Sequence, residues 1–192
     1  MHSGKVRYLG TSTWPAWKLV ESVWLAKELG SNRFVCEQPP YHILDRRYER
    51  ELAPVVEQYG FGVIPWSPLA GGFLTGKYRR GAERPADSRL SSGNVRQGLF
   101  SDRSFDVLET IEELAAAKGC TPSQLALAWC AAGPGITAPI VGPRSVEQLE
   151  DNLGALDVTI TPADFERIDA VSPPGGFIAR YYEAAFGANL YR

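Results

Sequence analysis

The segment spanning residues 63–78 carries the side chains best suited to chemistry in this chain. A short β-branched run ends at Pro65, and the flat indole of Trp66 follows directly. The loop beyond it holds a pair of glycines and then a cation at Lys77. These features suit a dinucleotide, which needs a ring to stack on, backbone N–H groups for its pyrophosphate and a counter-charge. An ordinary strand-to-loop transition with a packed tryptophan would have a similar sequence, because glycine loops are common.

Composition narrows the class of protein. The 192 residues fit one domain, 1–192, with 44% apolar residues and a net charge of −2. Such a charge gives no electrostatic basis for binding nucleic acid or an anionic membrane, and no apolar run approaches the ~20 residues of a membrane-spanning helix. Cys36, Cys120 and Cys130 show no CxxC spacing, so we expect no metal site and a reducing compartment, the cytoplasm.

Strand-like and helix-like segments alternate along the chain, which favours a parallel α/β sheet with helical crossovers. A long polar loop over 71–101 exceeds the length of ordinary connections, so we expect a lid or clamp there. The tail from residue 172 is expected to be irregular. Thr13 is the predicted cap of the first helix. The predicted strands are 6–12, 34–38, 62–66 and 137–141, and the predicted helices are 15–29, 46–59, 105–118, 122–130, 145–153 and 163–171.

Four of the residues that could bind a ligand lie at the carboxyl ends of predicted strands: Ser12, Gln38, Trp66 and Gly142. Parallel sheets and barrels build their sites at the carboxyl ends of their strands. We therefore expect these four positions to share one edge of the sheet.

Four segments together resemble the aldo-keto reductases, in the branch that includes the potassium-channel β subunits. They are Leu9–Trp14, Cys36–His42, Trp66–Gly72 and Gly142–Asn152, and they occur in the family's order and spacing. The resemblance implies a (β/α)8 TIM barrel that binds NADPH in an extended pose, without a Rossmann glycine fingerprint.

The resemblance also implies a role for each matching residue. Ser12 and Gln38 would hold the nicotinamide carboxamide, and Trp66 would lie under the nicotinamide ring. The family more often has Glu where Asp151 stands. The remaining implied contacts are Ser67, Leu69, Gly71, Lys77 and Arg89 for the pyrophosphate, Gly142, Arg144, Ser145 and Gln148 around the 2′-phosphate, and Asp151 and Asn152 for the adenine edge.

Simpler interpretations remain open for several of these residues. Ser12 could cap a helix, Gln38 could be a loop residue, and Arg144 could be a solvated surface charge. Tyr41 and His42 could suggest an acid–base pair, but the resemblance does not make this tyrosine catalytic, and a structural His42 is preferred.

The aromatic tail carries Phe177, Tyr181, Tyr182 and Phe186. These rings could line a substrate pocket or could pack on the barrel, and the sequence does not favour either.

The resemblance covers only the second half of the barrel, strands five to eight. The family's catalytic Asp, Tyr, Lys and His lie on the first half, so no catalytic residue is predicted here. About four strands cannot close an eight-stranded barrel. A truncated reading frame is the preferred explanation, followed by a homodimer, with a separate partner chain as the third.

Two functions follow from these observations. The first is an NADPH-dependent reductase of small aldehydes or ketones, or the cofactor-binding half of one. The alternative is a catalytically inactive NADPH-binding module that regulates or binds a partner.

Overall fold

A three-stranded parallel sheet and six α-helices make up the part of the chain that the computed structural model describes, residues 1, 3–86, 88–91 and 97–179. Helices α4, α5 and α6 begin near the predicted bounds, because Thr121, Ser145 and Thr161 cap their N-termini. In chain order the elements are β1 (Gly10–Ser12), α1 (Ala16–Glu28), β2 (Cys36–Gln38), α2 (Tyr48–Tyr59), β3 (Gly62–Val63), the 3-10 turns η1 (Ala70–Thr75) and η2 (Gln97–Phe100), α3 (Asp102–Lys118), α4 (Pro122–Ala131), α5 (Val146–Leu153), η3 (Gly154–Asp157) and α6 (Pro162–Val171).

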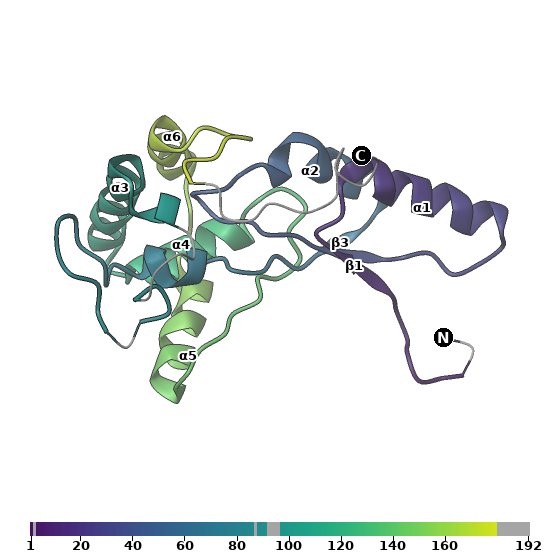
Figure 1. Ribbon diagram of the computed structural model, residues 1–192, viewed down its shortest axis with the longest axis horizontal. Coiled ribbons are helices and arrows are strands. Elements are labelled where there is room, and N and C mark those ends of the chain that lie inside the picture. The colour runs from purple at the N-terminus through teal and green to yellow at the C-terminus, as the bar shows by residue number, and fades with distance from the viewer. Residues whose placement is uncertain (2, 87, 92–96, 180–192) are drawn as a thin grey trace.

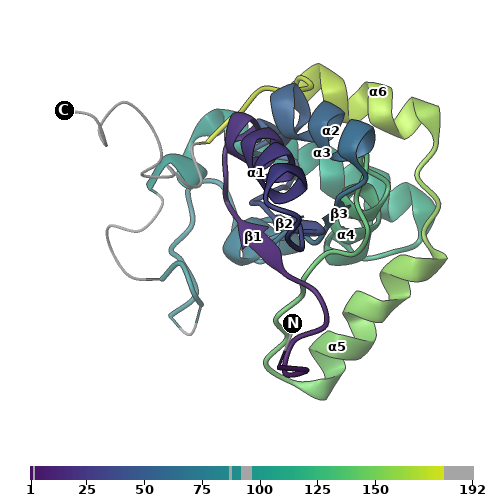
Figure 2. The ribbon, with the colours of Figure 1, turned by 90° about the vertical axis from the view of Figure 1, so that its right-hand side faces the viewer.

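The sheet has the order β1-β2-β3, with Ser12 beside Gln38 and Glu37 beside Val63. Its crossover helices α1 and α2 pack against each other above the strands (Figures 1 and 2). This arrangement confirms the predicted parallel α/β class and agrees with a partial barrel.

The predicted fourth strand over residues 137–141 is wrong as a strand, although this segment does run beside β3. The N–H of Thr137 donates to the carbonyl of Val63 over 2.8 Å, and the N–H of Ile140 donates to the carbonyl of Pro65 over 2.8 Å. A regular ladder fails because the N–H of Val63 donates to the Thr137 hydroxyl, at 3.0 Å, instead of to a carbonyl. Pro139, which has no N–H, interrupts the segment further.

The start of the chain also differs from expectation. The first strand is Gly10–Ser12, shorter than the predicted 6–12. Thr13 does not cap α1, because its φ of 60° lies in the left-handed region and Pro15 takes the cap position. The carboxylate of Glu37 instead accepts the N–H of Trp14 at 3.0 Å. A buried acid on β2 therefore binds the chain leading into the helix.

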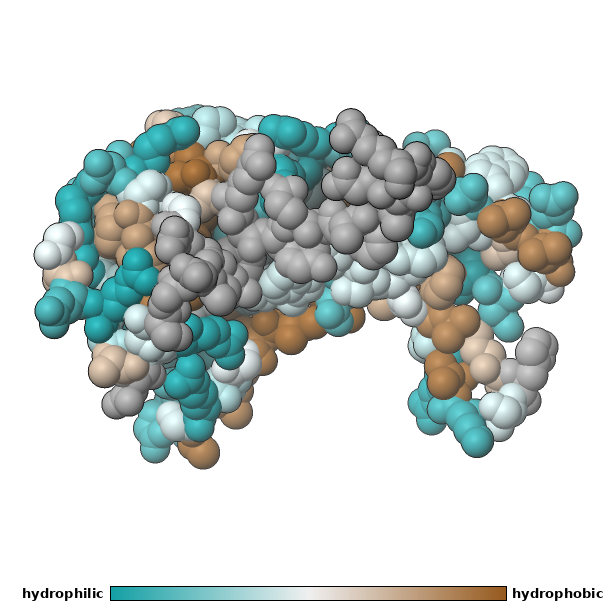
Figure 3. Space-filling model, in the orientation of Figure 1, coloured by the Kyte–Doolittle hydropathy of each residue, from teal (hydrophilic) through white to brown (hydrophobic). Residues whose placement is uncertain are grey.

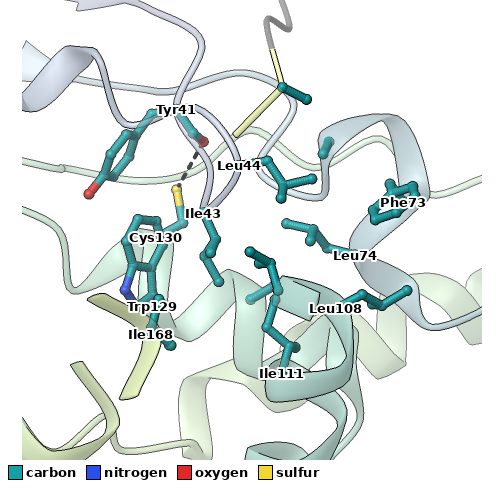
Figure 4. Packing of buried hydrophobic residues seen from close by; sticks show 14 of the residues in the cluster. Tyr41, Ile43, Leu44, Phe73, Leu74, Leu108, Ile111, Trp129, Cys130 and Ile168 are labelled. Atoms are coloured by element: carbon teal, nitrogen blue, oxygen red, sulfur yellow. Dashed lines mark hydrogen bonds between the residues drawn. The ribbon is translucent and has the colours of Figure 1, made fainter. Parts of the chain in front are cut away.

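The main core lies between the loop that follows β2 and helices α3, α4 and α6 (Figure 4). Trp129 and Cys130 on α4 are fully buried, and the Cys130 thiol lies 3.6 Å from the carbonyl oxygen of Tyr41. Cys130 is therefore a core residue. Ile43 and Leu44 enter the same cluster, so the strand-end loop is attached to the helical layer by apolar packing.

Seen from the side, the molecule forms an arch, with the segment before β1 and helix α5 descending as its two legs (Figures 1 and 3). Both legs carry exposed apolar side chains: Tyr8 on the first, and Val146 and Leu153 on α5. Trp17 and Trp24 are a further exposed pair on the outside of α1. Exposed apolar groups on this scale are typical of surfaces that meet another protein segment.

The described helices include none with the length and apolar character that crossing a bilayer demands.

Candidate functional site

A cleft of about 490 Å³ opens between the loop after β3, the 140–144 segment and helix α5. It brings together most of the predicted cofactor residues, although they are distant in sequence. The predicted residues that line it are Trp66, Ser67, Leu69, Gly71, Lys77, Arg89, Gly142, Arg144, Gln148, Asp151 and Asn152.

The floor of the cleft is a loop whose backbone is held in an unusual conformation. Ser67, Ala70, Gly71 and Gly72 all have positive φ, between 50° and 95°. The N–H of Ala70 donates to the carbonyl of Ser67, and the N–H of Gly72 donates to the carbonyl of Leu69, both over 2.8 Å. Left-handed backbone at a residue with a side chain costs roughly 1–2 kcal/mol and is concentrated at functional sites. Ser67 and Ala70 therefore make this loop a candidate for a ligand-binding role.

Gly72 leaves room for the ammonium group of Lys77. A Cβ at position 72 would lie 3.1 Å from Lys77 Nζ and 3.4 Å from its Cε. The end of the Lys77 side chain therefore lies over the backbone of Gly72, which has no side chain, and both residues line the cleft. The Lys77 ammonium also lies 5.3 Å from the centre of the Tyr78 ring.

The charge of the cleft is opposite in sign to that of the whole chain. Its charged lining residues are three cations, Lys77, Arg89 and Arg144, and one carboxylate, Asp151. The complete chain has a net charge of −2. A positive, concave site in a slightly acidic protein attracts anions and concentrates them locally.

One side of helix α5, with Gln148, Asp151 and Asn152, lines the same cleft. Ser145 caps this helix by accepting the N–H of Gln148 at 3.3 Å, and the Gln148 carboxamide oxygen accepts the N–H of Arg144 at 2.9 Å. Ser145 itself does not line the cleft. The N-terminus of a helix favours an anion, because its N–H groups and dipole carry partial positive charge.

Asp151 lines the cleft, but its carboxylate also contacts protein groups. One oxygen accepts the Thr121 hydroxyl and the Gln124 amide, each at 3.1 Å. Because Thr121 and Gln124 form the capping box of α4, Asp151 links the start of that helix to α5. The sequence interpretation of Asp151 did not include this structural connection.

Ser12 and Gln38 lie at the neighbouring strand ends, outside the residues that line the cleft. The Ser12 hydroxyl donates to the backbone carbonyl of Gln38 at 3.1 Å. Next along the edge, the N–H of Trp66 donates to the carbonyl of Pro39 at 3.0 Å. The expected order of Ser12, Gln38 and Trp66 along one sheet edge is therefore present.

Several lining residues were not foreseen. Ser123 is the most informative of them, because it sits on the first turn of α4, two residues after the Thr121 cap, a position that could have been inferred from the sequence. The others not assigned to the site from sequence are Pro68, Gly72, Thr75, Ile140, Val141 and Pro143.

Tyr41 and His42 are both buried and away from the cleft. The Tyr41 hydroxyl donates to Glu49 at 2.7 Å, and burial, followed by the charge of Glu49, raises the pKa of Tyr41 far above its ordinary value. His42 has no solvent exposure. This environment agrees with a structural place for the pair and disfavours acid–base chemistry by them.

Glu37 is a buried acid that sequence reasoning did not single out. It has no exposed surface and accepts the Thr11 hydroxyl and the Trp14 N–H. Burial raises the pKa of Glu37, and these hydrogen bonds oppose the rise. The acid is positioned directly before Gln38 on β2, at the sheet edge beside the cleft.

Metal ligands do not gather within the described part of the chain: no three His, Cys, Asp or Glu side chains there are placed to hold an ion. Cys36, Cys120 and Cys130 are free thiols.

Comparison with known proteins agrees with this geometry. The model of the aldo/keto reductase family matches residues 1–173. The chain belongs to the aldo/keto reductase family. It is 34% identical over 177 residues to an uncharacterized oxidoreductase, YrpG, of Bacillus subtilis, covering 92% of this chain and 52% of that protein. It is 38% identical over 176 residues to a probable voltage-gated potassium channel subunit beta of Oryza sativa, covering 88% of this chain and 53% of the relative.

A protein of Arabidopsis thaliana with the same description is 38% identical over 172 residues, 85% of this chain and 52% of the relative. The chain therefore spans about half the length of the relatives it matches. Membership in the family implies a barrel fold, and the partial sheet seen here is consistent with such a barrel.

Proposed function

We propose that this aldo/keto reductase chain binds NADPH in the cleft and forms the cofactor-binding half of a carbonyl reductase. The observation that carries the proposal is that Lys77, Arg89 and Arg144 line one cleft together with a glycine loop and one side of helix α5. NADPH carries a pyrophosphate and a 2′-phosphate, which are the anions that guanidinium and ammonium groups bind well. The residues of the cleft therefore fit this cofactor.

Within this proposal each part of the cleft has a task. The backbone of the 67–72 loop and Lys77 hold the pyrophosphate, while Arg144 and the start of α5 hold the 2′-phosphate. Trp66 supports the nicotinamide ring, and Ser12 and Gln38 at the adjoining strand ends orient it. The bound nicotinamide supplies a hydride to the carbonyl carbon of a small aldehyde or ketone.

Reduction also requires a proton at the carbonyl oxygen. Tyr41 is a poor donor, since its hydroxyl is buried and hydrogen-bonded to Glu49. We place the donor on a second half-barrel that completes the site, supplied by another segment or another chain. The exposed apolar side chains on both legs of the arch support such an association (Figure 3).

Arg144 provides the sharpest test of cofactor identity. Arg144→Met should weaken NADPH binding by about tenfold or more, the usual effect of losing a charged hydrogen bond, and should leave NADH binding nearly unchanged. Nicotinamide fluorescence measures both titrations, and Arg167→Met, which removes an exposed arginine from α6, is the matched control. Equal losses for NADPH and NADH would refute the 2′-phosphate assignment, and no binding by the native chain would refute the proposed function.

A non-catalytic NADPH-binding module is the second candidate, favoured by the enclosed Tyr41 hydroxyl and by relatives described as potassium channel subunits. The two candidates differ in turnover. Loss of nicotinamide absorbance with a panel of aldehydes would support the reductase, whereas binding without turnover, in the assembled protein, would support the module. Sedimentation velocity decides whether the chain associates with itself, and a stable monomer would exclude the homodimer.

A further inference from the structure

A strap of ten residues, 77–86, leads away from the cleft and lies along helix α3. We name it the strap because it begins at the cleft cation Lys77 and leads toward the cleft cation Arg89. Between them the chain turns outward, and Arg79 and Arg80 contact α3. The positions of Lys77 and Arg89 therefore depend on how the strap is held against α3.

Arg80 makes the most extensive of these contacts. Its guanidinium nitrogens lie 2.9 Å from Asp102, 2.7 Å from Asp106 and 3.1 Å from Glu109. Positions 102, 106 and 109 share one face of α3, because helical neighbours recur every three or four residues. One guanidinium thus binds carboxylates on two turns of the helix, while Arg79 pairs with Glu112 one turn further on.

These carboxylates are well exposed: 89% of the Asp102 side chain and 57% of the Asp106 side chain face solvent. Exposed ion pairs add little to global stability. Three partners on a single cation nevertheless define one position for the strap, since the planar fork of arginine matches several carboxylates at once.

Beneath the ion pairs lies an aromatic cluster that connects the strap to the loop lining the cleft. Tyr78 stacks on Phe73 with ring centres 5.9 Å apart and meets the edge of Phe100 at 5.4 Å. The guanidinium of Arg80 lies over Phe105 at 5.5 Å, and that of Arg84 lies over Phe100 at 3.8 Å. Tyr78 directly follows Lys77, so displacement of the strap would move the lysine ammonium.

We propose that Arg80 is a positioning residue that fastens the strap to α3 and thereby holds Lys77 in the cleft, slowing release of the bound anion. The anion is NADPH if the proposed function holds, and this part of the inference rests on that proposal. Fastening of the strap itself does not depend on any ligand.

Amide hydrogen exchange and cofactor dissociation test the two parts separately. Arg80→Gln should speed exchange in the strap and raise the dissociation rate of NADPH roughly two- to fivefold, the effect expected of an exposed ion-pair network. Arg80→Lys keeps the charge but loses the fork, so it should fall between the native chain and Arg80→Gln. The difference between variants should shrink at about 1 M salt, where the Debye length falls to about 3 Å.

Arg167→Gln is the matched control, because Arg167 forms an exposed pair with Glu113 on the same helix, at 2.7 Å, but lies on α6. It should leave strap exchange and NADPH dissociation at native values. Identical strap exchange in Arg80→Gln and Arg167→Gln would overturn the fastening. Faster exchange with an unchanged dissociation rate would overturn the effect on the ligand, and absence of NADPH binding in the native chain would refute the proposed function but not the fastening.

Discussion

Replacing Gly72 by alanine would affect the stability of the chain and its cofactor affinity through two separable mechanisms. The residue has a φ of 95°, and a left-handed backbone costs a residue with a Cβ about 1–2 kcal/mol. For a chain of this size, that loss lowers the melting temperature by roughly 2–8 °C. The new methyl group would also lie 3.1 Å from Lys77 Nζ, which must move. Displacing this cation should weaken NADPH binding by about tenfold.

Gly30→Ala separates these two effects. Gly30 follows α1 with a φ of 59°, and no atom lies within 4 Å of the position its Cβ would take. We expect both variants to lose stability in thermal unfolding, and only Gly72→Ala to lose NADPH affinity in fluorescence titration. Native affinity in Gly72→Ala would refute the reasoning that Lys77 binds the cofactor from above this glycine.

Two further variants test the buried charges. Arg46→Met should cost about 3–5 kcal/mol in urea unfolding, because it removes the cation 2.8 Å from the carboxylate of Glu49, whose side chain is only 11% exposed; a loss below about 1 kcal/mol would show that the pair is effectively solvated. Glu37→Gln tests pH dependence: burial raises the folded-state pKa of Glu37 above 4.5, so its contribution is fully present below pH 4.5 and is lost as the pH rises toward the folded-state value. The melting temperature of the native chain should therefore fall relative to Glu37→Gln as the pH rises from 4.5, and a constant difference would contradict the shift.

The sequence predicted the helices and the membership of the cleft better than it predicted the strands. Helix caps are local signals: Thr121-Pro122 and Thr161-Pro162 begin helices wherever the chain later packs. A strand depends on its neighbour, and the 137–141 segment failed because the Thr137 hydroxyl occupied a backbone donor of β3. Neither the alternation of apolar residues nor β-propensity reveals that a side-chain hydroxyl has replaced a carbonyl as the hydrogen-bond partner of a strand.

The prediction of residue roles from the sequence was limited for the same reason, because some roles depend on partners distant in the chain. Lys77 could be placed in the cleft because it belongs to the glycine loop after the strand end at Trp66, and Arg144 because the family resemblance implied its role. The contacts of Asp151 with Thr121 and of Glu37 with Thr11 join residues far apart in the chain, and no local pattern announces them. Of the predicted aromatic tail, Phe177 packs beside Arg47, while Tyr181, Tyr182 and Phe186 lie outside the described residues.

Because of Pro139, the two edges of the sheet differ in their capacity to pair with another strand. An open sheet with hydrogen-bonding strands on both margins can add copies of itself one after another and grow into a fibre. Beside β3, the N–H groups of Thr137, Ala138 and Ile140 all donate inward to the carbonyls of Val63 and Pro65, and the remaining residue of this run, Pro139, has no N–H to face outward. That margin lacks a donor for an incoming strand, which disfavours polymerisation in that direction and leaves the β1 side as the better margin for pairing.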